Sequence, residues 1–173
     1  MARNRKSAKD AGSAFEQWTA DYLAGTLGMP IERRTNHGAK DCGDIAGVRV
    51  HGNDVVVECK SVSSPNLWRI LDEAEAERRN AGVQLGIAVL KVPGCGRASM
   101  ERQLVAMDWG MWEEMASICG RVVLWESRAL WKPSRMQAFA DGRVWRVSKQ
   151  GEGIREAAVM TLGKWAGIAE GER

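Results

Sequence analysis

The stretch Asp-Val-Val-Val-Glu-Cys-Lys at residues 54–60 limits the possible folds of this chain more than any other segment. Three consecutive valines favour a buried strand in the middle of a sheet. Strand side chains alternate between faces, so Glu58 and Lys60 share one face and Cys59 projects from the other. The stretch therefore predicts a central strand with one apolar face and one charged face.

The residues around this strand predict alternating helices and strands. Apolar spacing, capping residues and Gly or Pro breakers mark the boundaries. In chain order we expect a helix over 13–27 with Ser13 as N-cap, strands over 31–34, 45–50 and 54–60, a helix over 65–80 with Ser64 as N-cap, a strand over 84–92 and a helix over 99–119. Gly52-Asn53 should form the turn of a hairpin between the second and third strands.

After Gly120 the pattern is weaker. It predicts a strand over 121–125, a hairpin turn at Asp141-Gly142 and a terminal helix over 153–165. We therefore expect an α/β fold with a core over residues 1–119 and a C-terminal α+β extension over 120–173, packed on the core and not clearly a separate domain.

Composition sets limits on the class of protein. The chain has 173 residues, 45% of them hydrophobic and 27% charged, which suits one compact domain. A net charge of +3 is too small by itself to indicate a nucleic-acid partner. No apolar run approaches the ~20 residues that a membrane span requires, and the start lacks the apolar stretch of a signal peptide. We expect no membrane association and a cytoplasmic location, in a bacterium or a phage-infected host.

An acid precedes the strand that should pair with residues 54–60. A hairpin entered at Asp44 would bring this carboxylate beside Glu58, with Lys60 close by. Two carboxylates can hold Mg²⁺, or Mn²⁺, which takes the same oxygen ligands, and the carbonyl of Cys59 could complete the coordination. Such an ion activates water for phosphodiester hydrolysis, and Lys60 would stabilise the negative charge that develops.

Other interpretations of these residues remain open. Glu58 and Lys60 are also compatible with ordinary solvated charges on a surface strand, and Asp44 with the start of a turn. Asp41 competes with Asp44 for the acidic role, although Asp44 directly adjoins the strand.

At these positions the chain resembles the PD-(D/E)XK nuclease superfamily. Gly43-Asp44-Ile45 matches the first acidic motif without the proline of the family's name, and Glu58-Cys59-Lys60 matches the second. The expected order of helix, three-strand meander, helix and strand over about residues 10–92 also matches the restriction-endonuclease-like core of that family. The resemblance implies metal binding by Asp44 and Glu58 and a catalytic Lys60.

Within the superfamily the chain is most similar to archaeal-type Holliday-junction resolvases and their phage relatives. These carry an additional glutamate on the first helix, matched here by Glu16, which the resemblance makes a supporting catalytic residue. The alternative is a capping box, in which Glu16 accepts a hydrogen bond from the backbone of Ser13.

Basic residues gather next to the expected metal site. Arg33 and Arg34 precede the polar loop, and His37 and Lys40 lie within it. They could bind the phosphates that flank the scissile bond, or they could simply be solvated.

We therefore expect a Mg²⁺-dependent endonuclease that acts on branched DNA as a homodimer, because symmetric cleavage of a junction requires two active sites. One alternative is a restriction-type or nicking nuclease on duplex DNA, with residues 120–173 recognising the target. The other is a catalytically silent DNA-binding module.

Overall fold

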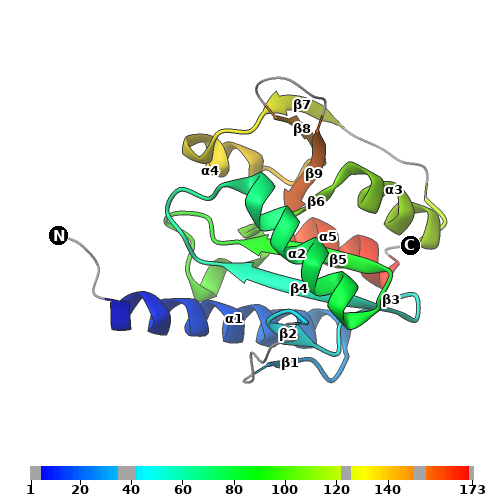
Figure 1. The fold of residues 1–173 in the computed structure, drawn as a ribbon, viewed down its shortest axis with the longest axis horizontal. Coiled ribbons are helices and arrows are strands. Elements are labelled where there is room, and N and C mark those ends of the chain that lie inside the picture. Colours follow the sequence, from blue (N-terminus) through cyan, green and yellow to red (C-terminus); the bar gives the residue numbers. More distant parts are fainter. Residues whose placement is uncertain (1–4, 35–41, 122–125, 150–154, 172–173) are drawn as a thin grey trace.

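A single mixed sheet organises the molecule (Figure 1). The structure, a computed structural model, describes residues 5–34, 42–121, 126–149 and 155–171. Within these ranges nine strands form one sheet in the order β1-β2-β4-β5-β6-β9-β8-β7, and β3 pairs with β4 beyond the end of β2. Only the β4–β5 and β7–β8 pairs are parallel. The α/β class expected from the sequence is confirmed, with a sheet that is mostly antiparallel.

The elements follow one another along the chain as follows. The first half comprises α1 (Arg5–Leu27), β1 (Glu32–Arg33), β2 (Ile45–Ala46), β3 (Arg49–Val50), β4 (Asn53–Lys60), α2 (Leu67–Ala81) and β5 (Leu85–Leu90). The second half comprises a 3₁₀ helix (Arg97–Arg102), β6 (Leu104–Asp108), α3 (Trp109–Ile118), β7 (Ser127–Leu130), a 3₁₀ turn (Pro133–Arg135), α4 (Met136–Phe139), β8 (Trp145–Ser148), β9 (Glu156–Thr161) and α5 (Leu162–Glu170).

Each face of the sheet has its own hydrophobic core. On one face, α1, α3 and α5 contribute Phe15, Trp112 and Trp165 to a core that also contains Val57 of β4. On the other face, α2 and α4 pack over β5, β6 and β9, as Leu71 and Phe139 do. In Figure 1, α2 crosses in front of β4 and β5, and α5 lies behind the sheet. Burial on both faces explains why the central strands are almost entirely apolar.

A β-bulge interrupts the expected strand over 45–50. Ile45 pairs with Val57 but Arg49 pairs with Asp54, so the first strand has one extra residue. The bulge includes Gly47, which has a φ of 87° and whose Cβ, if it had one, would lie 2.4 Å from the Pro30 carbonyl oxygen. Only glycine fits there without strain. The bulge divides the strand into β2 and β3.

The turn and caps differ from the expected ones by a few residues. Val50 pairs with Asn53, so the hairpin loop is His51-Gly52, both with positive φ, and not Gly52-Asn53. Helix α2 is capped by Asn66, whose side chain accepts from the Arg69 N–H, and not by Ser64. Helix α1 begins before Ser13, which therefore cannot be its N-cap.

The predicted helix over 99–119 is wrong in its first half. Leu104–Asp108 is strand β6, paired with β5 on one side and β9 on the other, and only Trp109–Ile118 is helical. Residues 104–107 are all buried, and a short apolar run without alternation does not distinguish strand from helix. The sheet decides the conformation because it supplies partners on both edges.

The C-terminal region also differs from expectation, and it extends the same sheet. The predicted helix over 153–165 is wrong, because Glu156–Thr161 is strand β9 between β6 and β8 and the helix begins at Leu162. Asp141-Gly142 is not a hairpin turn, since it connects α4 to β8, and β8 runs parallel to β7. The strand predicted over 121–125 lies almost wholly outside the described residues. Among the helices that the structure describes, none has the length and apolar character needed to cross a membrane.

Candidate active site

Strand β4 places its charged residues on the face covered by α2. Val55, Val57 and Cys59 belong to the core beneath α1. Lys60 instead forms an ion pair with Glu73 of α2 across 3.0 Å, and a second, closer ion pair with Glu58. The prediction of one apolar and one charged face is confirmed.

The register of β2 on β4 brings Asp44 to Glu58. Asp44 immediately precedes β2, whose Ile45 is paired with Val57, and its carboxyl shares a side-chain hydrogen bond with Glu58. The Cys59 N–H donates to Asp44 Oδ2 across 2.8 Å, and the Asp44 N–H donates to the Val57 carbonyl across 2.9 Å. Asp44 is therefore fixed in place by the hydrogen bond that its backbone N–H donates and by the one that its carboxylate accepts.

Gly43 permits this close approach. Its φ is 89°, and a Cβ at this position would lie 2.9 Å from a methyl carbon of Val56 and 3.0 Å from the Val57 carbonyl oxygen. Any side chain would push the chain away from β4 and carry Asp44 with it. The positive φ and the lack of room for a Cβ explain why the residue before Asp44 is glycine.

Burial and mutual proximity perturb both carboxyls. Asp44 is 8% exposed and Glu58 is 5% exposed. Burial raises the pKa of Asp44 to about 7; the negative charge of Glu58 acts in the same direction, and the hydrogen bond from Cys59 opposes both. Burial also raises the pKa of Glu58 to about 7, against the hydrogen bond from Lys60. Two acids that resist ionisation side by side favour a cation between them.

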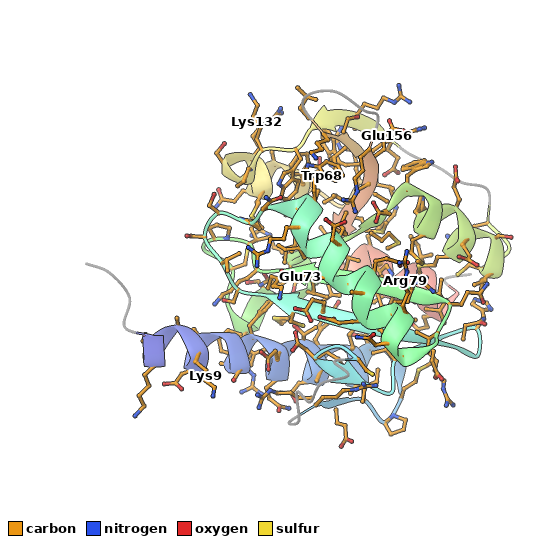
Figure 2. The ribbon with its side chains drawn as sticks, viewed as in Figure 1. Lys9, Trp68, Glu73, Arg79, Lys132 and Glu156 are labelled. Atoms are coloured by element: carbon orange, nitrogen blue, oxygen red, sulfur yellow. The ribbon has the colours of Figure 1, made fainter. Side chains whose placement is uncertain are left out.

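Lys60 remains a cation in this setting. Burial alone would lower its pKa, but the hydrogen bonds and charges of Glu58 and Glu73 raise the pKa above the ordinary lysine value. Glu73 shows the complementary effect: hydrogen bonds from Lys60 and Arg69 outweigh its burial and lower its pKa. Figure 2 shows Glu73 in the middle of α2, beside β4. Glu73 thus positions the Lys60 ammonium.

Two acidic residues of α2 were not predicted as part of the site. These residues are Glu73 and Glu77. Glu77 is 9% exposed, and its charge and a hydrogen bond raise the pKa of Glu58. Glu77 lies three residues after the buried Ala74 and seven after the buried Ile70. This helical spacing places it on the apolar face of α2, a signal that the sequence contained.

Glu16 lies near the pair but has its own partner. Arg33 donates from Nε to Glu16 Oε2 across 2.6 Å and from Nη2 to Ser13 Oγ across 3.1 Å. The negative charge of Glu16 contributes to the raised pKa of Asp44. The capping-box alternative is wrong because Ser13 lies inside α1.

The basic residues predicted to bind DNA are distributed differently. Arg33 is engaged by Glu16. The N–H of Arg34 donates to the Asp44 carbonyl across 2.7 Å, and its side chain lines a cavity of about 360 Å³ with Arg49 and Asp54. His37 and Lys40, together with the competing acid Asp41, lie outside the described residues.

The donor set at this site fits a hard divalent cation. Asp44 and Glu58 supply carboxylate oxygens. Because the N–H and C=O of one strand residue point to the same edge, the carbonyl of Cys59 faces the side of Asp44 and not β5. Among the described residues, no three His, Cys, Asp or Glu side chains form a metal-binding group. Two carboxylates and a carbonyl, completed by water and phosphate oxygens, suit Mg²⁺.

In the structure, Asp44, Glu58 and Lys60 lie together, with Glu73 and Glu77 beside them. Glu16 lies near Asp44 but is paired with Arg33.

Comparisons of the chain with protein-family models, with curated proteins and with solved structures found no match.

Proposed function

We propose that the protein is a divalent-metal-dependent endodeoxyribonuclease that hydrolyses phosphodiester bonds in branched DNA. The observation that carries the proposal is the pair of buried carboxyls, Asp44 and Glu58, which share a hydrogen bond and have the Lys60 ammonium beside them. The Asp-Glu-Lys set, the order of elements from α1 to β5 and the resemblance to PD-(D/E)XK nucleases support it.

The roles of the residues follow from their chemistry. Asp44, Glu58 and the Cys59 carbonyl would hold Mg²⁺ or Mn²⁺. When bound, the ion would neutralise the two carboxylates, lower the pKa of a coordinated water and offset phosphate charge. Lys60, kept charged by Glu58 and Glu73, would attract the scissile phosphate and stabilise the charge that develops on it. Glu16 would act through its effect on Asp44.

The substrate and assembly belong to the proposal as well. Branched DNA and a homodimer follow from the likeness to junction resolvases, since two symmetric cuts need two active sites. Arg34, His37 and Lys40 are the proposed contacts to flanking phosphates. Arg33 would serve mainly to orient Glu16, because its guanidinium is already paired.

The test compares cleavage of a labelled four-way junction and a matched linear duplex, with Mg²⁺ or with EDTA. The variants are Asp44→Asn and Lys60→Ala, with Asp54→Asn as the matched control, since Asp54 lies on the same strand but is paired with Arg49 at the surface. We expect metal-dependent cleavage of the junction by the wild type and the control, and none by the two site variants.

Other outcomes would change the conclusion in defined ways. Metal-dependent cleavage of the duplex in preference to the junction would keep the site and replace branched DNA by a restriction-type or nicking activity. DNA binding without cleavage at any metal concentration would favour a silent binding module.

A further inference from the structure

A second, open cavity lies at the carboxyl ends of β4 and β5. It has a volume of about 150 Å³ and is lined by Ser61, Val62, Ser63, Lys91 and Pro93. The two strand ends are joined there, because the Lys91 N–H donates to the Lys60 carbonyl across 3.0 Å. The cavity therefore begins one residue beyond the catalytic lysine. Ligands of α/β folds commonly bind beyond the carboxyl ends of parallel strands.

Lys91, which lines this cavity, differs from Lys60 in its charge partners. Among the described residues, no carboxylate forms an ion pair with Lys91, whereas Lys60 has Glu58 and Glu73. The Lys91 ammonium instead lies 5.3 Å from the ring centroid of Trp18 and 6.0 Å from that of Phe15, both on α1. Aromatic faces hold a cation in place and leave its charge uncompensated. Lys91 is thus positioned to attract an anion.

The remaining lining residues suit a phosphate group. Ser61 and Ser63 supply hydroxyl donors, and a phosphate oxygen accepts hydrogen bonds from such donors and from lysine. Val62, 46% exposed, adds an apolar surface at the rim that fits the sugar of a nucleotide. One lysine and two hydroxyls offer no bidentate fork for a carboxylate, which favours the phosphate.

The two lysines lie on opposite faces of the sheet. Leu90 packs in the core beneath α2, so the next residue, Lys91, projects toward α1, in agreement with its contacts to Phe15 and Trp18. Lys60 projects toward α2. A strand of DNA with its scissile phosphate at Lys60 would therefore cross the ends of β4 and β5 and reach the α1 side at Lys91.

We propose that Lys91, Ser61 and Ser63 form a subsite for a DNA backbone phosphate next to the scissile one. The inference rests on the proposed function, since it assigns the path of the DNA strand beyond the cleavage site. Lys91 binds and orients this phosphate and takes no part in bond cleavage.

The experiment measures binding of the labelled junction and duplex, with Ca²⁺ in place of Mg²⁺, over a series of salt concentrations. It compares the wild type with Lys91→Gln, the charge-conserving Lys91→Arg and the matched control Lys132→Gln. Lys132 is exposed and lies next to α4, far from α1 in Figure 2. Cleavage by the same proteins is then followed with Mg²⁺, and thermal unfolding confirms that each variant is folded.

We expect Lys91→Gln to weaken binding about five- to tenfold near 0.1 M salt and to reduce the slope of log K against log salt by about one, because one phosphate contact is lost. With Mg²⁺ it should raise KM and leave kcat unchanged. Lys91→Arg should restore the wild-type salt slope, and Lys132→Gln should change binding less than about twofold.

The inference is overturned if Lys91→Gln keeps the wild-type affinity and salt slope, or if Lys132→Gln weakens binding equally. Normal cleavage by the wild type alongside either result contradicts this inference alone. A wild type that binds no DNA at any salt concentration contradicts both this inference and the proposed function.

Discussion

Two groups of charged side chains differ in how their carboxyls are paired. At the Arg155 cluster, one guanidinium bridges two carboxylates: it donates to both oxygens of Asp108 at 3.1 Å and to Asp72 at 2.8 Å, and it lies over the ring of Trp68. At the acidic pair, Asp44 and Glu58 share a side-chain hydrogen bond, and the ammonium of Lys60 is shared between Glu58 and Glu73.

The two groups also differ in how deeply their carboxyls are buried. The Arg155 cluster joins the residue before β9 to α2 and to the end of β6, and both of its carboxylates accept hydrogen bonds from the guanidinium. The acidic pair, Asp44 and Glu58, is buried more deeply than the Arg155 cluster, so ionising both of its acids costs more stability. Such a cost is typical of functional sites, where it is recovered when a ligand binds.

The largest expected effect is on DNA cleavage, and it should appear in the acidic pair but not in the Arg155 cluster. Glu58→Gln removes a metal-binding charge and should reduce metal-dependent cleavage about a thousandfold, whereas Asp108→Asn should leave kcat unchanged. Single-turnover cleavage of the junction measures both. Equal losses in the two variants would mean that the acidic pair has no special role in cleavage.

The second prediction concerns stability and pH. The pKa of Asp44 is raised from 3.8 to about 7, so the folded protein keeps a proton that the unfolded chain loses between these values. The free energy of unfolding therefore falls as the pH rises from about 4 to 7, and stays low above that range. Asp44→Asn cannot ionise, so it should gain on the order of 3 kcal/mol over the wild type at pH 8 and little at pH 4.

Denaturant unfolding without metal, at pH 4, 6 and 8, measures this difference. Asp108→Asn is the matched control, because Asp108 is paired with Arg155. A variant Asp44→Asn that is less stable than the wild type at pH 8 would show that its carboxylate is stabilised in the folded protein without a metal.

The third prediction concerns metal binding without cleavage. Mg²⁺ at about a hundred times its Kd should stabilise the wild type by roughly 2.7 kcal/mol, because the ion binds only the folded state. In Asp44→Asn and Glu58→Gln this gain should be lost, and Arg155→Met should retain it. Thermal unfolding with Mg²⁺ or EDTA reports the shift. The same shift in all four proteins would place the ion elsewhere.

The smallest effect concerns the Arg155 cluster itself. Its side chains are between 31% and 68% exposed, so solvent screens their attraction. Arg155→Met should therefore lower the free energy of unfolding by only about 1 kcal/mol, with the loss reduced in high salt. Denaturant unfolding at 0.05 and 1 M NaCl measures both. A salt-independent loss would attribute the effect to packing on Trp68.

The sequence predicted the parts of the site that depend on local rules. Period-two alternation placed Glu58 and Lys60 on one face of β4, and the pairing of Ile45 with Val57 brought Asp44 near Glu58. The α/β class and the order from α1 to β5 followed from helical periodicity and from glycine breakers such as Gly82, which caps α2. These features involve neighbours in the chain, or strands that follow each other directly.

The remaining features were decided by segments distant in sequence. Residues 156–161, rich in alanine, form β9 because β6 and β8 offer hydrogen-bonding partners on both edges, which outweighs helix propensity. Of the four acids of α2, helical spacing distinguishes only Glu77, and packing on β4 brings both Glu73 and Glu77 to the site. Local backbone preferences determined strand β4 and the alternation of its side chains. Burial and sheet pairing, which depend on the whole chain, decided which strands and helices surround it.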